Sequence, residues 1–133
     1  MRHLSFRCIA LGFAVSVALA LFAAFGAGRF AGDMDERQWD QAFAGLAQDP
    51  SFLLLSLVLG VATTVVGGHV AARMAGRLPY MHAAAVGLIG LVLGLFMWDS
   101  AYPLWWNLLA HATLLPSALW GGHLAKRRAS PLR

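Results

Sequence analysis

The chain has 133 residues, of which only 12% are charged and 59% are hydrophobic. An ordinary soluble domain has about 25% charged and about 45–50% apolar residues, so this chain has too few polar side chains to cover a water-facing surface. The same apolar content excludes a disordered chain, and a single cysteine excludes a disulfide framework. A membrane protein is the class that remains.

The ten basic and six acidic residues all lie outside four uncharged runs, each at least 21 residues long. A bilayer core of about 30 Å needs about 20 helical residues, so each run can cross it. None shows the alternation typical of membrane strands. We therefore expect an all-α membrane protein with one integral membrane domain over residues 1–133. Its four transmembrane helices are predicted at about 8–28, 51–72, 79–98 and 103–124.

The signs of the charges predict the orientation. Eight basic residues lie at the two termini or between the second and third spans, whereas Arg29, Arg37 and all six acids lie on the other side. Basic residues mark the cytoplasmic side, so we expect two hairpins with both termini cytoplasmic. The net charge of +4 then reflects topology, and we expect lipid and no nucleic acid as a partner. An aromatic belt is predicted at the outer surface, formed by Trp98, Tyr102, Trp105 and Trp106.

Two segments near the start of the chain need separate interpretation. The first span could alternatively be a cleaved signal peptide, because small residues follow its apolar run. In the next loop, Asp33 and Glu36 suggest a capping box, and apolar residues recur at helical spacing after them. We expect a short periplasmic amphipathic helix at about 34–48, ended by Asp49-Pro50; the acids of this loop could instead ligate a divalent cation. The apolar face comprises Trp39, Ala42, Phe43, Leu46 and Ala47.

Small residues recur along one face of several spans and predict close helix packing, because lipid provides little hydrophobic drive between helices. They do not show whether the partner helix belongs to the same chain, a second copy or another membrane protein. The predicted packing positions are Gly12, Ser16, Ala20, Gly60, Thr64, Gly68, Gly87, Gly90 and Gly94.

A short repeat ends the second and fourth spans: Gly67-Gly68-His69 followed by an Arg, and Gly121-Gly122-His123 followed by Lys-Arg. It indicates either a parallel repeat of two hairpins or convergence on one way of ending a helix. The segment 67–77, then His82-Ala83, then Pro116 ahead of Gly121 also resembles a family of small, uncharacterised four-helix bacterial inner-membrane proteins. In that family the position of His69 is often Tyr. The resemblance covers the last three spans and implies an inner-membrane location without an activity.

Histidines provide the candidate sites. His69, His82 and His123 lie near the same ends of their spans and could bind zinc or copper if they converge, or could serve as amphipathic tips at the interface. His111 lies deeper, with Asn107 one turn earlier on the same face, as in an interhelical hydrogen bond or a proton relay. No Asp, Glu, Lys or Arg lies inside a span, and no catalytic or cofactor-binding residue is predicted.

Packing residues are therefore many, and catalytic patterns are lacking. We expect a non-enzymatic structural, accessory or assembly subunit without a cofactor, which packs through its small-residue faces. The alternative is a small transporter or channel that acts as an oligomer, with a polar path formed by Asn107, His111, Thr63 and Thr64.

Overall fold

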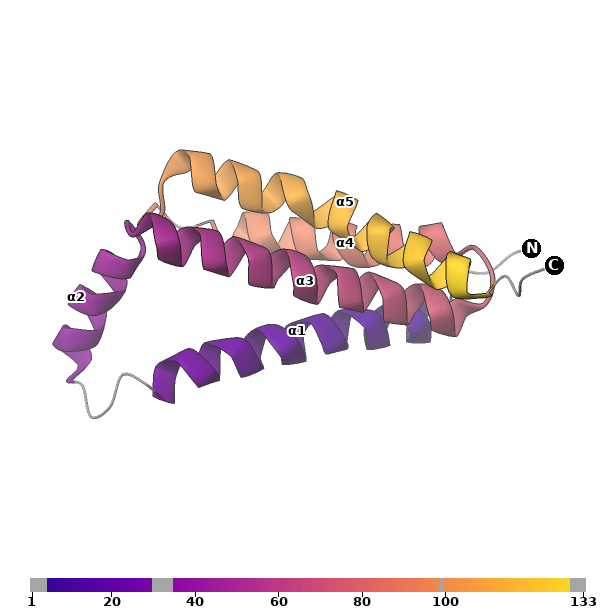
Figure 1. The fold of residues 1–133 in the computed structure, drawn as a ribbon, viewed down its shortest axis with the longest axis horizontal. Helices are drawn as coiled ribbons and strands as arrows, with labels where there is room; N and C mark the ends of the chain where they lie inside the picture. Colours follow the sequence, from indigo (N-terminus) through magenta and orange to yellow (C-terminus); the bar gives the residue numbers. More distant parts are fainter. Residues whose placement is uncertain (1–4, 30–34, 99, 130–133) are drawn as a thin grey trace.

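The computed structural model describes residues 5–29, 35–98 and 100–129, and in this part of the chain it has five helices and no strand. Four long helices form a bundle, and the short helix α2 projects from one end of it (Figure 1). The predicted all-helical class is confirmed. The helices are α1 (Phe6–Arg29), α2 (Glu36–Leu46), α3 (Pro50–Ala75), α4 (Pro79–Phe96) and α5 (Leu104–Ala129).

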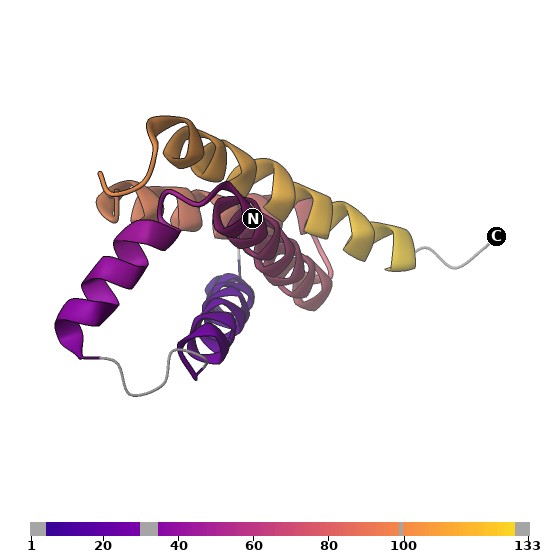
Figure 2. The same ribbon diagram turned by 60° about the vertical axis from the view of Figure 1, so that its left-hand side comes forward.

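Helix α3 is the centre of the bundle. It packs against α1, α4 and α5, while α1 also contacts α4, and α4 contacts α5. In two views related by a 60° turn, α1 and α5 lie on opposite sides of α3 (Figures 1 and 2). Helix α1 begins and α5 ends at the same end of the bundle, here called the terminal end. The opposite end carries α2 and is called the α2 end.

Two of the helices, α3 and α4, are long and apolar enough to cross a membrane. Only 22% of the most apolar 18-residue stretch of each helix is buried inside the bundle, whereas the core helix of a soluble protein is mostly buried. The exposed side chains are large and aliphatic: Val58 is 62% exposed and Leu88 55%. Such a surface needs lipid or another apolar partner around it.

The ends of α2 and α3 differ from the prediction. Asp33 lies outside the described residues, and the N-cap of α2 is Asp35, whose backbone N–H donates to Oε1 of Gln38 at 3.1 Å. Asp49 was expected to end the amphipathic helix, but it caps the following one: its carboxylate accepts from the N–H groups of Ser51 (2.8 Å) and Phe52 (2.9 Å). Pro50 then occupies the first turn of α3, where no N–H is needed.

Helix α2 spans 11 residues, and contacts near its C-terminal end join it to the bundle. Ala47, just after it, is fully buried. The Phe43 ring meets that of Tyr102 edge to face, with centroids 6.2 Å apart, and Nε2 of Gln48 donates to the carbonyl of Ala101 at 2.7 Å. The side chain of Trp39, predicted on the apolar face of α2, lies outside the described part. The α2 segment is thus attached to the α4–α5 loop.

Glycines bring the helix backbones together at the terminal end. A Cβ on Gly67 would overlap the hydroxyl of Ser16, and one on Gly68 would overlap the carbonyl of Ala118. A Cβ on Gly12 would stand 2.6 Å from the Ala71 methyl group. The packing predicted for Gly12, Ser16 and Gly68 therefore joins helices of this one chain. Gly87 packs likewise, since its Cβ would stand 2.9 Å from that of Ala118.

Other small residues do not act in this way. A Cβ on Gly60 or Gly90 would meet nothing within 4 Å, and Gly94 faces the His111 ring rather than a helix backbone. Ala20 is exposed. The pattern of small residues continues along whole helices. However, α1 diverges from α3 towards the α2 end (Figure 1), so these positions have no facing backbone.

The two Gly-Gly-His segments are not equivalent in space. Gly67 meets α1 and Gly68 meets α5, whereas Gly121 meets α3 and Gly122 meets Ala83 of α4. A two-fold axis relating the hairpins would pair Gly121 with α4 and Gly122 with α3. The contacts are exchanged, which favours convergence on one way of packing a helix end.

Candidate functional site

Of the three histidines proposed as metal ligands, His82 and His123 have separate partners. His82, 2% exposed, accepts the backbone N–H of Ser5 on Nε2 at 3.0 Å and places Nδ1 3.1 Å from the carbonyl of Leu78. Since a carbonyl only accepts, Nδ1 carries the ring proton. Nδ1 of His123 lies 2.9 Å from the hydroxyl of Tyr80. No three His, Cys, Asp or Glu side chains in residues 5–29, 35–98 and 100–129 are grouped to hold a metal ion.

The His82 contacts tie the first described residue to α4. The bond to Ser5 spans 77 positions of the chain, and Sγ of Cys8 lies 3.3 Å from Oγ of the same serine. The His82 ring is therefore saturated, with one donor and one acceptor engaged. This arrangement is a structural latch between the beginning of α1 and the beginning of α4.

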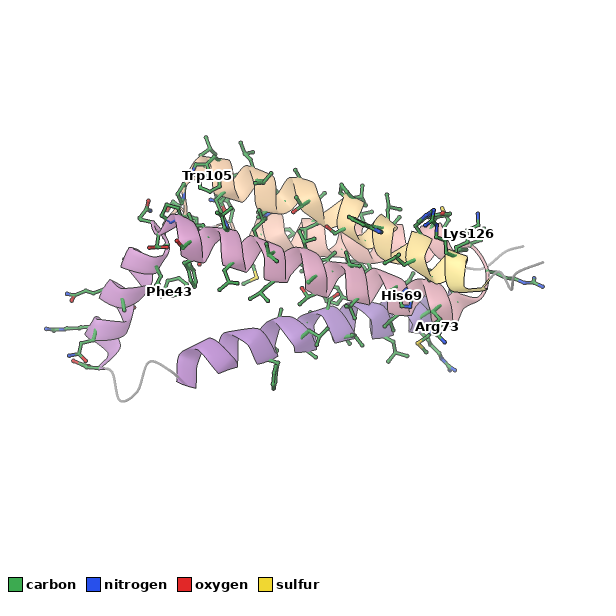
Figure 3. All side chains as sticks on the ribbon, viewed as in Figure 1. Phe43, His69, Arg73, Trp105 and Lys126 are labelled. Carbon is green, nitrogen blue, oxygen red and sulfur yellow. The ribbon has the colours of Figure 1, made fainter. Side chains whose placement is uncertain are left out.

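Basic side chains gather at the terminal end, where Figure 3 labels Arg73 and Lys126. Nζ of Lys126 lies 5.3 Å from the centre of the Tyr80 ring, close enough for a cation–π contact. Arg73 is in the last turn of α3, where a cation complements the helix dipole. These cations lie at the edge of the apolar part of the bundle.

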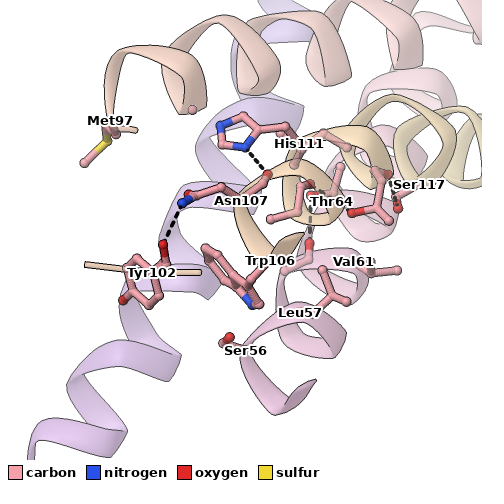
Figure 4. A pocket seen from close by; sticks show the side chains of 15 residues that line it. Ser56, Leu57, Val61, Thr64, Met97, Tyr102, Trp106, Asn107, His111 and Ser117 are labelled. Carbon is pink, nitrogen blue, oxygen red and sulfur yellow. Dashed lines mark hydrogen bonds between the residues drawn. The ribbon is translucent and has the colours of Figure 1, made fainter. Parts of the chain in front are cut away.

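A cavity of about 270 Å³ lies towards the α2 end, between α3, the end of α4 and the first half of α5. It contains Asn107 and His111, which Figure 4 shows together with Thr64 and Trp106. Asn107 is 3% exposed. We call this space the His111 cavity. Its remaining lining residues are Ser56, Leu57, Gly60, Val61, Gly94, Met97, Tyr102, Ala110, Thr113, Leu114 and Ser117.

His111 is held in place by its own helix and by Trp98. Its Nδ1 lies 2.6 Å from the backbone carbonyl of Asn107, and its ring stacks on that of Trp98 with centroids 5.4 Å apart. The interhelical bond expected for this residue is thus replaced by one within α5. Nε2 is buried and has no hydrogen-bond partner among the described residues. A ring fixed in this way presents a bare acceptor atom.

Aromatic residues near the cavity pack inward as well as outward. Tyr102 and Trp106 stack with ring centroids 4.6 Å apart, and Nε1 of Trp106 donates to the carbonyl of Leu53 at 3.1 Å. Trp98 and Trp105 are 42% and 50% exposed, so both remain at the surface of the bundle. Of the predicted belt, Trp106 therefore fastens α5 to the first turn of α3.

A second space of about 220 Å³ lies between α1, α3 and α4, where α1 diverges. Small and hydroxyl side chains line much of it, with Thr63 and Thr64 on one wall. It shares Gly60, Thr64 and Leu114 with the His111 cavity, so the two spaces adjoin. We call it the Gly90 groove. Its other lining residues are Phe13, Ser16, Val17, Ala20, Val86 and Gly90.

Sequence reasoning found Asn107 and His111 but missed the residues that shape their surroundings. Ser117 and Met97 carried no pattern, and Gly94 was placed in a packing stripe. Comparison with protein-family models, with curated proteins and with solved structures finds no match for this chain. The site therefore has to be interpreted from its own geometry.

Proposed function

We propose that the chain is a non-enzymatic multi-pass membrane protein of the inner membrane, with α1, α3, α4 and α5 as four spans. Lengths of 24 and 26 residues are sufficient for α1 and α5. The basic residues at the terminal end support cytoplasmic termini, and the acids near α2 support a periplasmic position for that helix. Asn107 and His111 make α5 less apolar than α3, and both line the cavity between the helices, as polar residues of a spanning helix usually do.

Within that architecture we infer that the protein is a small transporter whose substrate binds in the His111 cavity. The observation that carries this proposal is the bare Nε2 of His111, buried in a cavity that also contains Asn107 and Thr64. Buried polar atoms are normally paired, so an unpaired one fixed beside a cavity indicates a binding role. The packing glycines, by contrast, are largely occupied within the chain, which leaves less support for an accessory role.

Flux measurements test the transport proposal. The protein is reconstituted into vesicles, and rapid filtration follows the entry of radiolabelled small neutral solutes, from polar urea and xylitol to the more apolar phenol and indole. We expect faster entry than into protein-free vesicles for at least one solute, and His111→Ala should slow it. His123→Ala, which changes a histidine at the terminal end, is the matched control. Entry at the protein-free rate for every solute would refute transport.

The Gly90 groove favours a second candidate, an accessory subunit that receives a helix of another membrane protein or a second copy. Ser16, Ala20, Gly60 and Gly90 line it, and small residues allow close approach of a helix. Gly90→Leu would fill this groove. A loss of the native oligomer or partner on size-exclusion chromatography, with the helical content unchanged, would support this role.

A further inference from the structure

The serine, threonine, tryptophan and histidine side chains of the His111 cavity offer an occupant acceptors more than donors. The only donor of the Trp106 side chain, Nε1, is already bonded to the carbonyl of Leu53. Besides Tyr102, four serine and threonine side chains with hydroxyls line the cavity, and each of these four donates its proton to a carbonyl three or four residues earlier in its own helix. They keep their lone pairs, because a hydroxyl has one proton and two acceptor sites. The four are Ser56, Thr64, Thr113 and Ser117.

His111 adds the least satisfied of these acceptors. The 2.6 Å contact with the carbonyl of Asn107 requires the ring proton on Nδ1, so Nε2 of the neutral ring carries a lone pair. That atom is buried without a partner in the described part of the chain. Gly94 provides the room beside it, since a Cβ there would stand 2.9 Å from Nε2. Leaving such an atom unpaired is costly, and an occupant with a donor would remove the cost.

The cavity also favours an occupant that is uncharged and of limited size. None of the described residues that line the cavity is Asp, Glu, Lys or Arg, so these residues offer no counter-charge to an ion that would lose its hydration there. Leu57, Val61 and Leu114 make part of the wall apolar. A cavity of about 150 Å³ accepts benzene, and this one, at about 270 Å³, has room for a somewhat larger body.

We propose that the His111 cavity binds a neutral, largely apolar molecule that donates one hydrogen bond, from N–H or O–H, to Nε2 of His111. This inference rests on the proposed function and adds the chemistry of the substrate. The same donor could belong to a free solute or to the hydroxyl of a membrane lipid. The experiment below separates these two sources.

Indole and benzofuran are matched probes, because they share shape and size but differ at one position, where indole has N–H and benzofuran has an ether oxygen. Saturable binding to the full chain in mild detergent is measured by equilibrium dialysis against empty micelles. Indole should bind about tenfold more tightly than benzofuran, whose oxygen would face the lone pair of Nε2. This comparison uses the wild-type chain and needs no variant to fold.

Two pairs of variants locate the effect. His111→Asn can keep a donor for the Asn107 carbonyl but has no atom at the position of Nε2, whereas His111→Gln can reach that position with an acceptor. We expect the first to lose about tenfold in indole affinity and the second to stay within about threefold of wild type. Gly94→Ala places a methyl group against Nε2 and should block indole; Gly90→Ala, one turn earlier, has open space around its Cβ and should leave binding unchanged.

The outcomes are distinct. If benzofuran binds as tightly as indole while Gly94→Ala blocks both, the proposed hydrogen bond from the ligand to Nε2 of His111 is wrong, and the cavity remains a binding site. If neither probe binds saturably to the wild-type chain, both the proposed hydrogen bond and the proposal that the cavity binds substrate are wrong. If indole binds more tightly than benzofuran, diacylglycerol, which carries a hydroxyl donor, is added together with indole. Competition with indole identifies a membrane lipid as the natural donor, and lack of competition identifies a free solute. The proposed hydrogen bond to Nε2 of His111 is supported in both cases.

Discussion

The two ends of the bundle use the same residue type in opposite ways. At the terminal end, Gly67, Gly68 and Gly121 each bring a backbone against a neighbouring helix. Towards the α2 end, Gly60 and Gly90 face open space, and the two cavities lie beside them. Glycine spacing therefore indicates where helices could approach, whereas the divergence of the helices decides whether they do. One end is rigidly packed, and the other has space for a ligand.

The largest expected effect tests the packed end. Gly68→Ala would drive a Cβ into the carbonyl of Ala118, and backbone cannot yield as a flexible side chain can. We expect the free energy of unfolding to fall by about 3 kcal/mol, near the upper range for overpacking. Unfolding in mixed micelles measures it. Gly60→Ala in the same helix is the control and should be neutral or slightly stabilising, because Ala favours helix. Equal effects at the two positions would contradict the contrast between the ends.

The His82 latch is the next strongest contact of the packed end. His82→Ala leaves the N–H of Ser5 without its acceptor and should cost about 2 kcal/mol. Hydrogen–deuterium exchange should show faster exchange at the beginning of α1, with little change in α5. His123→Ala removes only the exposed contact with Tyr80 and should cost less than about 1 kcal/mol. Unchanged exchange at the start of α1 would show that the latch does not hold this helix.

The α2 end depends on capping instead. Asp49→Ala removes the carboxylate that accepts from Ser51 and Phe52, with an expected loss of about 1 kcal/mol. The same unfolding assay measures this loss, and exchange should rise in the first turn of α3. Asp40→Ala, an exposed acid of α2, is the matched control. A similar loss in the control would mean that charge, and not capping, is responsible.

The smallest effect concerns the polar bond between α1 and α3. The hydroxyl of Ser16 donates to the carbonyl of Thr63 at 3.0 Å. Interhelical bonds of this kind in membranes contribute about 0.6 kcal/mol on average, and Ser16→Ala should lose about that amount. Ser56→Ala, whose hydroxyl bonds only to its own helix, should lose less. The reverse order would show that this bond adds nothing to the packing by Gly67.

The sequence was informative about helices and much less so about their contacts. Uncharged runs predicted the helices well: the expected 51–72 corresponds to α3, Pro50–Ala75. A helix of about 34–48 was expected where α2 covers Glu36–Leu46. These patterns depend on local composition and spacing. Which glycine meets a backbone of this chain depends on crossing angles, which no local pattern encodes, so the sequence could not separate Gly60 and Gly90, which have no such contact, from Gly67 and Gly68.

The same limit explains the candidate site. Helical spacing placed Asn107 and His111 on one face, and the structure brings both to the cavity. The bare Nε2 depends on Gly94 of another helix and on a ring orientation set by Trp98. The three histidines predicted near the same ends of their helices are not grouped around one metal position in the described part of the chain. A similar position along separate helices was not sufficient to bring the side chains together.

The latch between Ser5 and His82 also has a consequence for biogenesis. The two residues are 77 positions apart, and the histidine belongs to α4. During synthesis α1 and α3 can pair as soon as both have emerged, because Ser16 and Gly67 lie within them. The beginning of α1, however, cannot be fastened in this way until α4 has been synthesised and lies beside it. Closure of the latch therefore comes later in synthesis than the pairing of α1 with α3, which precedes α4 in the chain.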